Sequence, residues 1–200
     1  TLFAGGGEEA SYPDPSPPPT APSPSLAPLT PNTSGGVVVY STDFQNDDGL
    51  WRLNPVTKLG STESMQVANG KLIISVRSGG GMYVNHVDLD TQQLADLEVE
   101  AILERAEGPD TMAYGLIFRN NADIGDLYFL INGQRQFGVF AHVRSAGGVV
   151  SLVPWTSSNL ISADQPNKLK AIAKGRVITV WANDKVLSTF EFDNVFSGGS

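Results

Sequence analysis

The feature that most constrains the fold is a succession of short β-rich runs after residue 36, each closed by a glycine or asparagine turn. Residues 71–77 alternate with a period of two, which places Leu72, Ile74 and Val76 on one face. We expect that face in the core and the opposite face at least partly in water. Asn69-Gly70, just before this run, is a strong hairpin signal and predicts pairing with a strand at 64–68.

Strand patterns then recur roughly every ten residues, with no convincing amphipathic helix between them. In residues 94–106, apolar side chains alternate with glutamates, and this alternation favours a strand even though Leu, Glu and Ala also suit helices. The pattern predicts an all-β, antiparallel sandwich or barrel. Further strands are expected at 37–41, 112–119, 127–131, 136–143, 148–152, 168–174, 177–182 and 186–192.

The first 36 residues have a different character, because residues 5–36 hold nine of the thirteen prolines and few apolar side chains. Such a segment cannot bury enough apolar surface to fold, so we expect a disordered, semi-rigid tether over 1–36 and one domain over 37–200. A ligand for a proline-recognition domain is the alternative. Asn32-Thr33-Ser34 matches a glycosylation sequon. Leu2-Phe3-Ala4 is consistent with the end of an upstream membrane anchor or signal.

Charge and cysteine content exclude several classes of function. The net charge of -8 disfavours a nucleic-acid surface, which needs clustered lysine and arginine. The absence of cysteine removes disulfides, thiol nucleophiles and thiolate metal sites. The lack of cysteine does not settle the compartment, although bacterial extracytoplasmic domains of this size commonly have no disulfides. We expect a periplasmic, cell-surface or secreted protein of bacterial origin.

Catalytic patterns are weak. His86 and His142 are the only histidines, and neither lies near a G-x-S-x-G motif; no metal-binding or phosphate-binding motif is present. Glu98 and Glu100 are spaced as a retaining glycosidase pair could be, but the residue between them is valine. We expect these glutamates to form a solvated strand face. The sequence therefore predicts no catalytic residue, no cofactor and no metal site.

Candidate binding residues come from the alternation, since an aromatic side chain on the wet face of a strand can stack on a sugar ring. If Ile178 and Val180 point inward, Thr179 and Trp181 point outward. By the same reasoning Arg119, His142 and Phe140 share one face, and Trp155 follows Pro154 in a loop. These residues could instead cover a second hydrophobic layer or an edge. The candidates for ligand binding are Arg119, His142, Trp155, Thr179 and Trp181.

The order and spacing of several motifs resemble the concanavalin A-like lectin and glucanase superfamily, specifically the laminin G-like jelly rolls of bacterial surface proteins. The resemblance covers nearly all of residues 39–199. The motifs are DFQNDDGLW (43–51), VANGKLIISV (67–76), YGLIFRN (114–120), LYFLI (127–131), PNKLKAIAKG (166–175) and ITVWANDKVL (178–187).

The resemblance implies a two-sheet jelly roll with a buried Asp43-Phe44 opening and one concave face, on which Arg119, His142, Thr179 and Trp181 would lie together. Family members use that face for glycans, for proteins or only for structure. The E-x-D-x-x-E strand of the hydrolase branch and the calcium loops of lectin relatives have no match here. Relatives continue after an F-S-G-G segment, here residues 196–199, with a closing strand. The sandwich is therefore either truncated or open at one edge, beside residues 37–41, for a strand from another chain.

The sequence predicts a non-catalytic, extracytoplasmic binding module with a carbohydrate as the favoured ligand. A structural or accessory subunit of a larger surface or membrane-bound assembly, bound to protein partners, is the alternative. A glycoside hydrolase is a third possibility.

Overall fold

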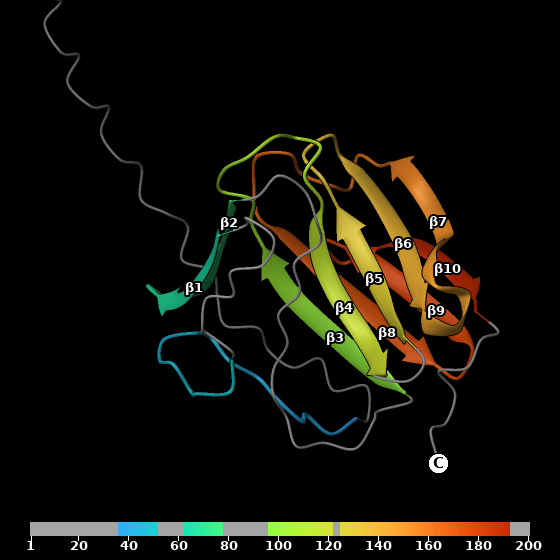
Figure 1. The fold of residues 1–200 in the computed structure, drawn as a ribbon, viewed down its shortest axis with the longest axis horizontal. Coiled ribbons are helices and arrows are strands. Elements are labelled where there is room, and N and C mark those ends of the chain that lie inside the picture. The colour runs from blue at the N-terminus through green and yellow to red at the C-terminus, as the bar shows by residue number, and fades with distance from the viewer. Residues whose placement is uncertain (1–35, 52–61, 78–95, 122–124, 193–200) are drawn as a thin grey trace, which may run out of the picture.

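A computed structural model describes residues 36–51, 62–77, 96–121 and 125–192 of the chain. In these residues the chain forms antiparallel β-sheets and one short 3-10 helix, η1 (Arg144–Ala146) (Figure 1). No helix in this part of the chain is long and apolar enough to cross a membrane. The expected tether and the region expected to lack a closing strand lie outside the described residues, apart from Gly36.

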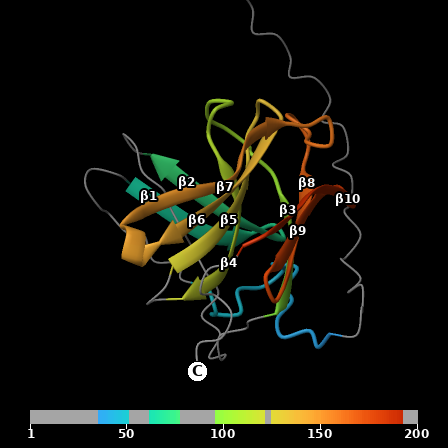
Figure 2. The same ribbon diagram turned by 90° about the vertical axis from the view of Figure 1, so that its right-hand side faces the viewer.

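Two four-stranded sheets face each other, as Figure 2 shows. The sheet called here the β8 sheet has the order β10-β9-β8-β3, and the β4–β7 sheet has the order β4-β5-β6-β7. The strands of the β8 sheet are β3 (Leu97–Leu103), β8 (Asn167–Lys174), β9 (Val177–Ala182) and β10 (Lys185–Glu191). Those of the β4–β7 sheet are β4 (Tyr114–Asn121), β5 (Gly125–Ile131), β6 (Gln136–Val143) and β7 (Gly148–Ser157). A separate two-stranded hairpin contains β1 (Thr62–Ala68) and β2 (Lys71–Arg77).

The hydrophobic core lies between the two four-stranded sheets. Alternate residues of each strand point into it, because successive side chains of a strand point to opposite faces. Leu169 and Val180 of the β8 sheet and Phe129 and Val139 of the β4–β7 sheet are completely buried there. This arrangement confirms the predicted all-β, two-sheet sandwich, and it confirms that Ile178 and Val180 point inward.

Strand lengths differ from the prediction at two places that matter for the site. The strand expected at 94–106 is shorter and ends at Leu103. The strand expected at 148–152 continues to Ser157, so Trp155 lies on β7 and not in a loop. Pro154 is compatible with this strand because β7 is the outermost described strand of its sheet, where one row of backbone N–H groups needs no partner.

The strand expected at 37–41 is absent, and that prediction is wrong. Residues 36–43 belong to no strand, and Val37 is 89% exposed. High β propensity alone does not form a strand, which also needs a neighbouring strand to accept its backbone hydrogen bonds. The predicted buried Asp43-Phe44 opening is also incorrect: Asp43 is exposed, and Phe44 is half-buried against the Trp51 ring at 5.4 Å.

The β1–β2 hairpin forms across Asn69-Gly70 as predicted, with Ala68 opposite Lys71. The prediction that one face of residues 71–77 lies in the core is wrong, because Ile74 and Val76 are exposed. The hairpin is a separate sheet, so period-two alternation marks the two faces of β2 without saying which one another layer covers.

Candidate functional site

The outer face of the β4–β7 sheet carries an aromatic surface with polar groups at both ends. Because Phe137, Val139, Ala141 and Val143 of β6 belong to the core, the residues between them point outward. On the neighbouring strand β7, the register places Ser151 opposite Phe140 and Ser157 opposite Gln136. The outward residues of β6 are Gln136, Gly138, Phe140 and His142.

Phe140 and Trp155 form the centre of this surface, which we call the aromatic platform. Their ring centroids are 5.4 Å apart and the rings are tilted by 54°, a geometry within the favoured range for aromatic pairs. Trp155 is 40% exposed. The Phe140 ring lies over Gly138, where a Cβ atom would come within 2.7 Å of it. Glycine at this position therefore leaves the space in which the Phe140 ring supports Trp155.

At one end of the platform, a polar cluster joins β5 and β6. Asp126 Oδ2 accepts a hydrogen bond from the Tyr128 hydroxyl at 3.1 Å and lies 3.5 Å from His142 Nδ1. The buried Asp126 Oδ1 has no hydrogen-bond partner among the described residues. Burial, and then the Asp126 carboxylate, raises the pKa of Tyr128 to about 12. The phenol therefore stays protonated and acts as a donor at neutral pH.

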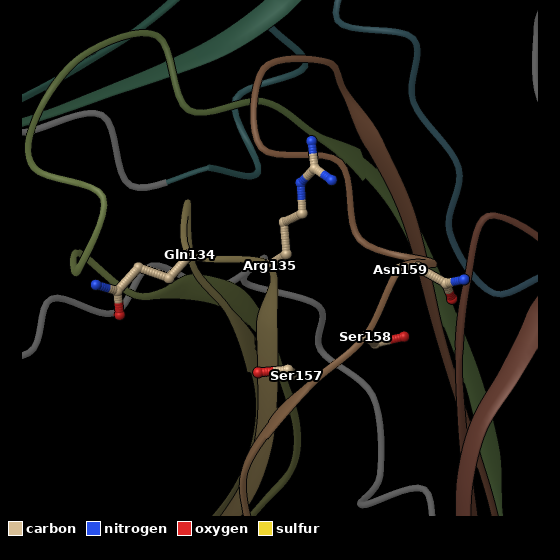
Figure 3. Close-up of a pocket in the computed structure, with 5 residues that line it drawn as sticks. All are labelled: Gln134, Arg135, Ser157, Ser158 and Asn159. Atoms are coloured by element: carbon tan, nitrogen blue, oxygen red, sulfur yellow. The ribbon is translucent and has the colours of Figure 1, made fainter.

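At the opposite end, the β5–β6 turn and the end of β7 line an open surface depression of about 320 Å³. We call it the apical pocket. Figure 3 shows the Arg135 side chain extending away from Ser157 and Ser158, with Gln134 to one side and Asn159 to the other. The Ser158 N–H donates to the Arg135 carbonyl oxygen at 2.9 Å, which holds the two segments together.

Backbone geometry at Arg135 is unusual, since its φ of 58° lies in the left-handed region. Asn132 holds the turn: its carbonyl oxygen accepts a hydrogen bond from the Arg135 N–H, and its side-chain Oδ1 accepts from the N–H groups of Gln134 and Gln136. Arg135 was not among the binding residues predicted from the sequence. The available signal was an arginine in a short hairpin loop where a residue with positive φ is needed.

Thr179 and Trp181 point outward from β9, as predicted, but on the other side of the molecule. The Lys170 ammonium lies 5.0 Å from the centroid of the Trp181 ring, and the Thr189 hydroxyl donates to Thr179 Oγ1 at 3.1 Å. The prediction that they share a face with His142 is therefore wrong. The two sheets share one core, so their outer faces point in opposite directions.

Arg119 does not lie on the outer face either, which corrects its predicted position beside His142 and Phe140. The register of β4 against β5 shifts between Phe118 and Asn121, and Arg119 has a φ of 51°. This bulge turns the side chain inward, where it is 3% exposed and its Nη2 donates to the Gly175 carbonyl oxygen at 2.7 Å. Arg119 therefore connects the β4–β7 sheet to the β8–β9 turn of the facing sheet.

The two glutamates weighed as a catalytic pair each face a lysine on β8. Glu98 lies 3.9 Å from Lys170, and Glu100 lies 3.4 Å from Lys168. The hydrogen bond between Lys168 and Asp184 raises the lysine pKa and lowers that of the aspartate, so both stay charged near neutral pH. In the described ranges no group of three His, Asp or Glu side chains is placed to hold a metal ion. His86 lies outside those ranges.

Comparison with protein-family models gives no match for this chain, and no curated protein matches it. Among solved structures, it is similar to a carbohydrate-binding module, CBM66, from Bacillus subtilis. The identity is 15% and the TM-score is 0.46, and the alignment covers 74% of this chain and 82% of that chain. At these values the similarity carries no argument about the ligand.

Proposed function

We propose that the sandwich is a non-catalytic carbohydrate-binding module of an extracytoplasmic, bacterial protein, and that its ligand lies across the outer face of β6 and β7. We also propose that it is a laminin G-like jelly roll of the concanavalin A-like superfamily, on the strength of the sequence motifs. The observation that carries the functional proposal is the exposed Trp155 ring, supported from the side by Phe140 and flanked by polar groups along the strands.

This arrangement suits a sugar because a sugar ring is amphipathic. An exposed aromatic ring offers an apolar surface for the C–H groups, while nearby donors and acceptors fix the hydroxyl groups. Gln136, Ser151, Ser157 and His142 provide such groups on the same face. Trp181 is less suitable, because the Lys170 ammonium already lies over its ring.

We propose that the sandwich is not a glycosidase because of the residues that face Glu98 and Glu100. A retaining glycosidase needs one carboxyl group that stays protonated as an acid and a second that acts as a nucleophile. Glu98 and Glu100 each face a lysine on the neighbouring strand. The pair therefore fits a cross-strand ladder of opposite charges.

The first test compares Trp155→Ala with Trp181→Ala, which removes the same side chain from the opposite face. Affinity electrophoresis against a panel of neutral and acidic polysaccharides gives the ligand and the relative affinities. We expect Trp155→Ala to weaken binding at least about tenfold, within the range for a central interface aromatic. Trp181→Ala should bind within about twofold of the wild type, a loss too small for an interface hot spot. Loss of binding in Trp181→Ala alone would assign the site to the other sheet.

A second candidate function, an accessory subunit that packs on other proteins, is favoured by the exposed edge of the β4–β7 sheet. Val149 on β7 is 59% exposed, and no strand among the described residues pairs with the outer side of β7. A strand from a partner protein could pair there. This candidate predicts that the β7 amide protons exchange more slowly in the native assembly than in the isolated protein. Unchanged exchange would remove the support for it.

A further inference from the structure

We propose that the apical pocket is a subsite for an acidic sugar unit, whose carboxylate or sulfate group is bound by Arg135. This inference rests on the proposed function, because it extends the glycan from the aromatic platform to the end of the same hairpin. It also defines the ligand class more narrowly, as an anionic glycan.

The backbone at Arg135 is the first argument. A non-glycine residue at positive φ is uncommon, because the left-handed conformation brings the Cβ atom of an L-residue close to the following carbonyl oxygen. Glycine or asparagine would relieve that strain in a short hairpin loop. Asn132 holds the left-handed conformation through its carbonyl and side-chain oxygens. Arginine is therefore a costly choice for the turn, and we infer that its side chain serves a function.

The polar lining of the depression is the second argument. The Leu160 N–H donates to Ser158 Oγ at 3.2 Å, which leaves the Ser158 hydroxyl proton for another acceptor. Ser157 and Asn159 line the same open depression as Arg135. Arginine presents two parallel N–H groups that match a carboxylate or a sulfate-like anion.

The local charge is the third argument. No ion pair among the described residues engages Arg135. Asp110, whose Oδ1 lies near the turn at Gly133, already accepts a hydrogen bond from Arg105 Nη2 at 2.6 Å. The net charge of -8 opposes an anion at long range, but salt at physiological strength screens charges beyond about 8 Å. A nearby carboxylate or sulfate therefore meets an uncommitted positive charge.

The pocket and the platform are close enough to hold one ligand. Trp155 and Ser157 are two residues apart on β7, and residues so spaced lie on the same face about 7 Å apart along the strand. Ser157 lines the pocket, while Trp155 contacts Phe140 on the platform. Neighbouring units of a single oligosaccharide can therefore stack on Trp155 and place an acidic group beside Arg135.

The test uses Arg135→Gly, which removes the side chain and relieves the backbone. Arg144→Gln is the matched control, because Arg144 is an exposed arginine at the other end of β6. The probes are trigalacturonate, its neutral counterpart galactotriose, and a galactotriose carrying 6-sulfate groups. Affinities are measured by isothermal titration calorimetry at low and high salt, and stability is measured by urea denaturation.

We expect the wild type to prefer at least one acidic trisaccharide over galactotriose by about fivefold or more, as a charge-assisted pair with added hydrogen bonds allows. Arg135→Gly should abolish this preference and should bind galactotriose as the wild type does. Its resistance to urea should be equal or higher. Arg144→Gln should keep the preference. The preferred acidic probe shows whether the natural anionic group is a carboxylate or a sulfate. High salt should weaken the binding of that probe more than the binding of galactotriose.

Three results would overturn the subsite, and they are distinguishable from failure of the proposed function. An acidic preference that survives in Arg135→Gly, or one that Arg144→Gln removes equally, shows that Arg135 is not the anion site. Galactotriose binding that depends on Trp155 but shows no acidic preference refutes the subsite and leaves the glycan platform intact. Failure of every polysaccharide in the panel to bind would contradict both proposals.

Discussion

Two amide side chains, the buried Asn167 and the exposed Asn183, hold the loops near the apical pocket in place. Asn167 is completely buried, and its side chain accepts a hydrogen bond from the Ser162 N–H at 2.8 Å and donates to the Ser162 carbonyl oxygen at 2.9 Å. Asn183, in the β9–β10 turn, donates to the Leu160 carbonyl oxygen at 2.8 Å and accepts from the Lys168 N–H at 3.0 Å. These side chains satisfy backbone groups that a loop would otherwise leave unpaired.

We therefore expect Asn167→Ala to lower the free energy of unfolding by about 2–3 kcal/mol, because it leaves buried backbone donors and acceptors without partners. Asn159→Ala, which changes an exposed asparagine of the same loop, is the control and should change it by less than about 0.5 kcal/mol. Urea denaturation followed by circular dichroism measures both. Equal effects of the two substitutions would show that Asn167 does not organise the loop.

Single residues also mark the limit of what the sequence can predict about the site. Alternation correctly placed His142, Thr179 and Trp181 on outer faces, because each lies on a regular strand. It failed for Arg119, where a bulge between Phe118 and Asn121 reverses the direction of the side chain. A bulge depends on pairing with the neighbouring strand, which a single-strand pattern does not contain.

At the scale of the strands, the β6–β7 hairpin combines two irregularities that create the aromatic platform. The register of β6 against β7 shifts on both sides of Val139, close to Trp155. Such shifts bend the strand and redirect its side chains. Gly138 then provides the space over which the Phe140 ring lies. The platform therefore depends on residues of both β6 and β7, and not on the exposed Trp155 alone.

Gly138→Ala should disrupt the platform without touching any polar group of the site. The added methyl group would lie 2.7 Å from the Phe140 ring, which must move away from Trp155. We expect a shifted Trp155 emission maximum, an approximately tenfold loss of glycan affinity and a destabilisation of about 1–3 kcal/mol. The affinity is measured by the same electrophoresis as for Trp155→Ala.

Gly148→Ala is the matched control, because Gly148 begins β7 and no atom lies within 4 Å of the added Cβ. It should preserve both the emission and the affinity. Glycan affinity that is unchanged in Gly138→Ala would show that the contact between Phe140 and Trp155 is not needed for binding.

The strands themselves were largely predictable, while the arrangement of sheets was not. The runs at 71–77, 136–143 and 177–182 were placed at their observed bounds, since regular alternation and adjacent turns define them. Nothing in the alternation of β6 and β9 says that they belong to facing sheets. That information lies in the pairing of distant strands, such as β3 with β8, which are separated by four other strands along the chain.

At the scale of the whole molecule, the two outer faces have different chemistry. The β8 sheet presents cross-strand pairs of glutamate and lysine, with Lys170 over Trp181. The β4–β7 sheet presents the aromatic platform between the polar cluster at Asp126 and the apical pocket. Since these faces point in opposite directions, a glycan on one leaves the other available for contact with the rest of a larger protein.

The most direct measurement of the central claim uses the three tryptophans of the chain, Trp51, Trp155 and Trp181, as position markers. Their indole N–H signals can be assigned by single substitution to phenylalanine and followed by NMR while a bound oligosaccharide is added. If the glycan lies on the aromatic platform, the Trp155 signal shifts in a saturable way, with the affinity found by calorimetry, while the signals of Trp51 and Trp181 stay in place. A saturable shift of Trp181 with Trp155 unchanged would contradict this position of the glycan.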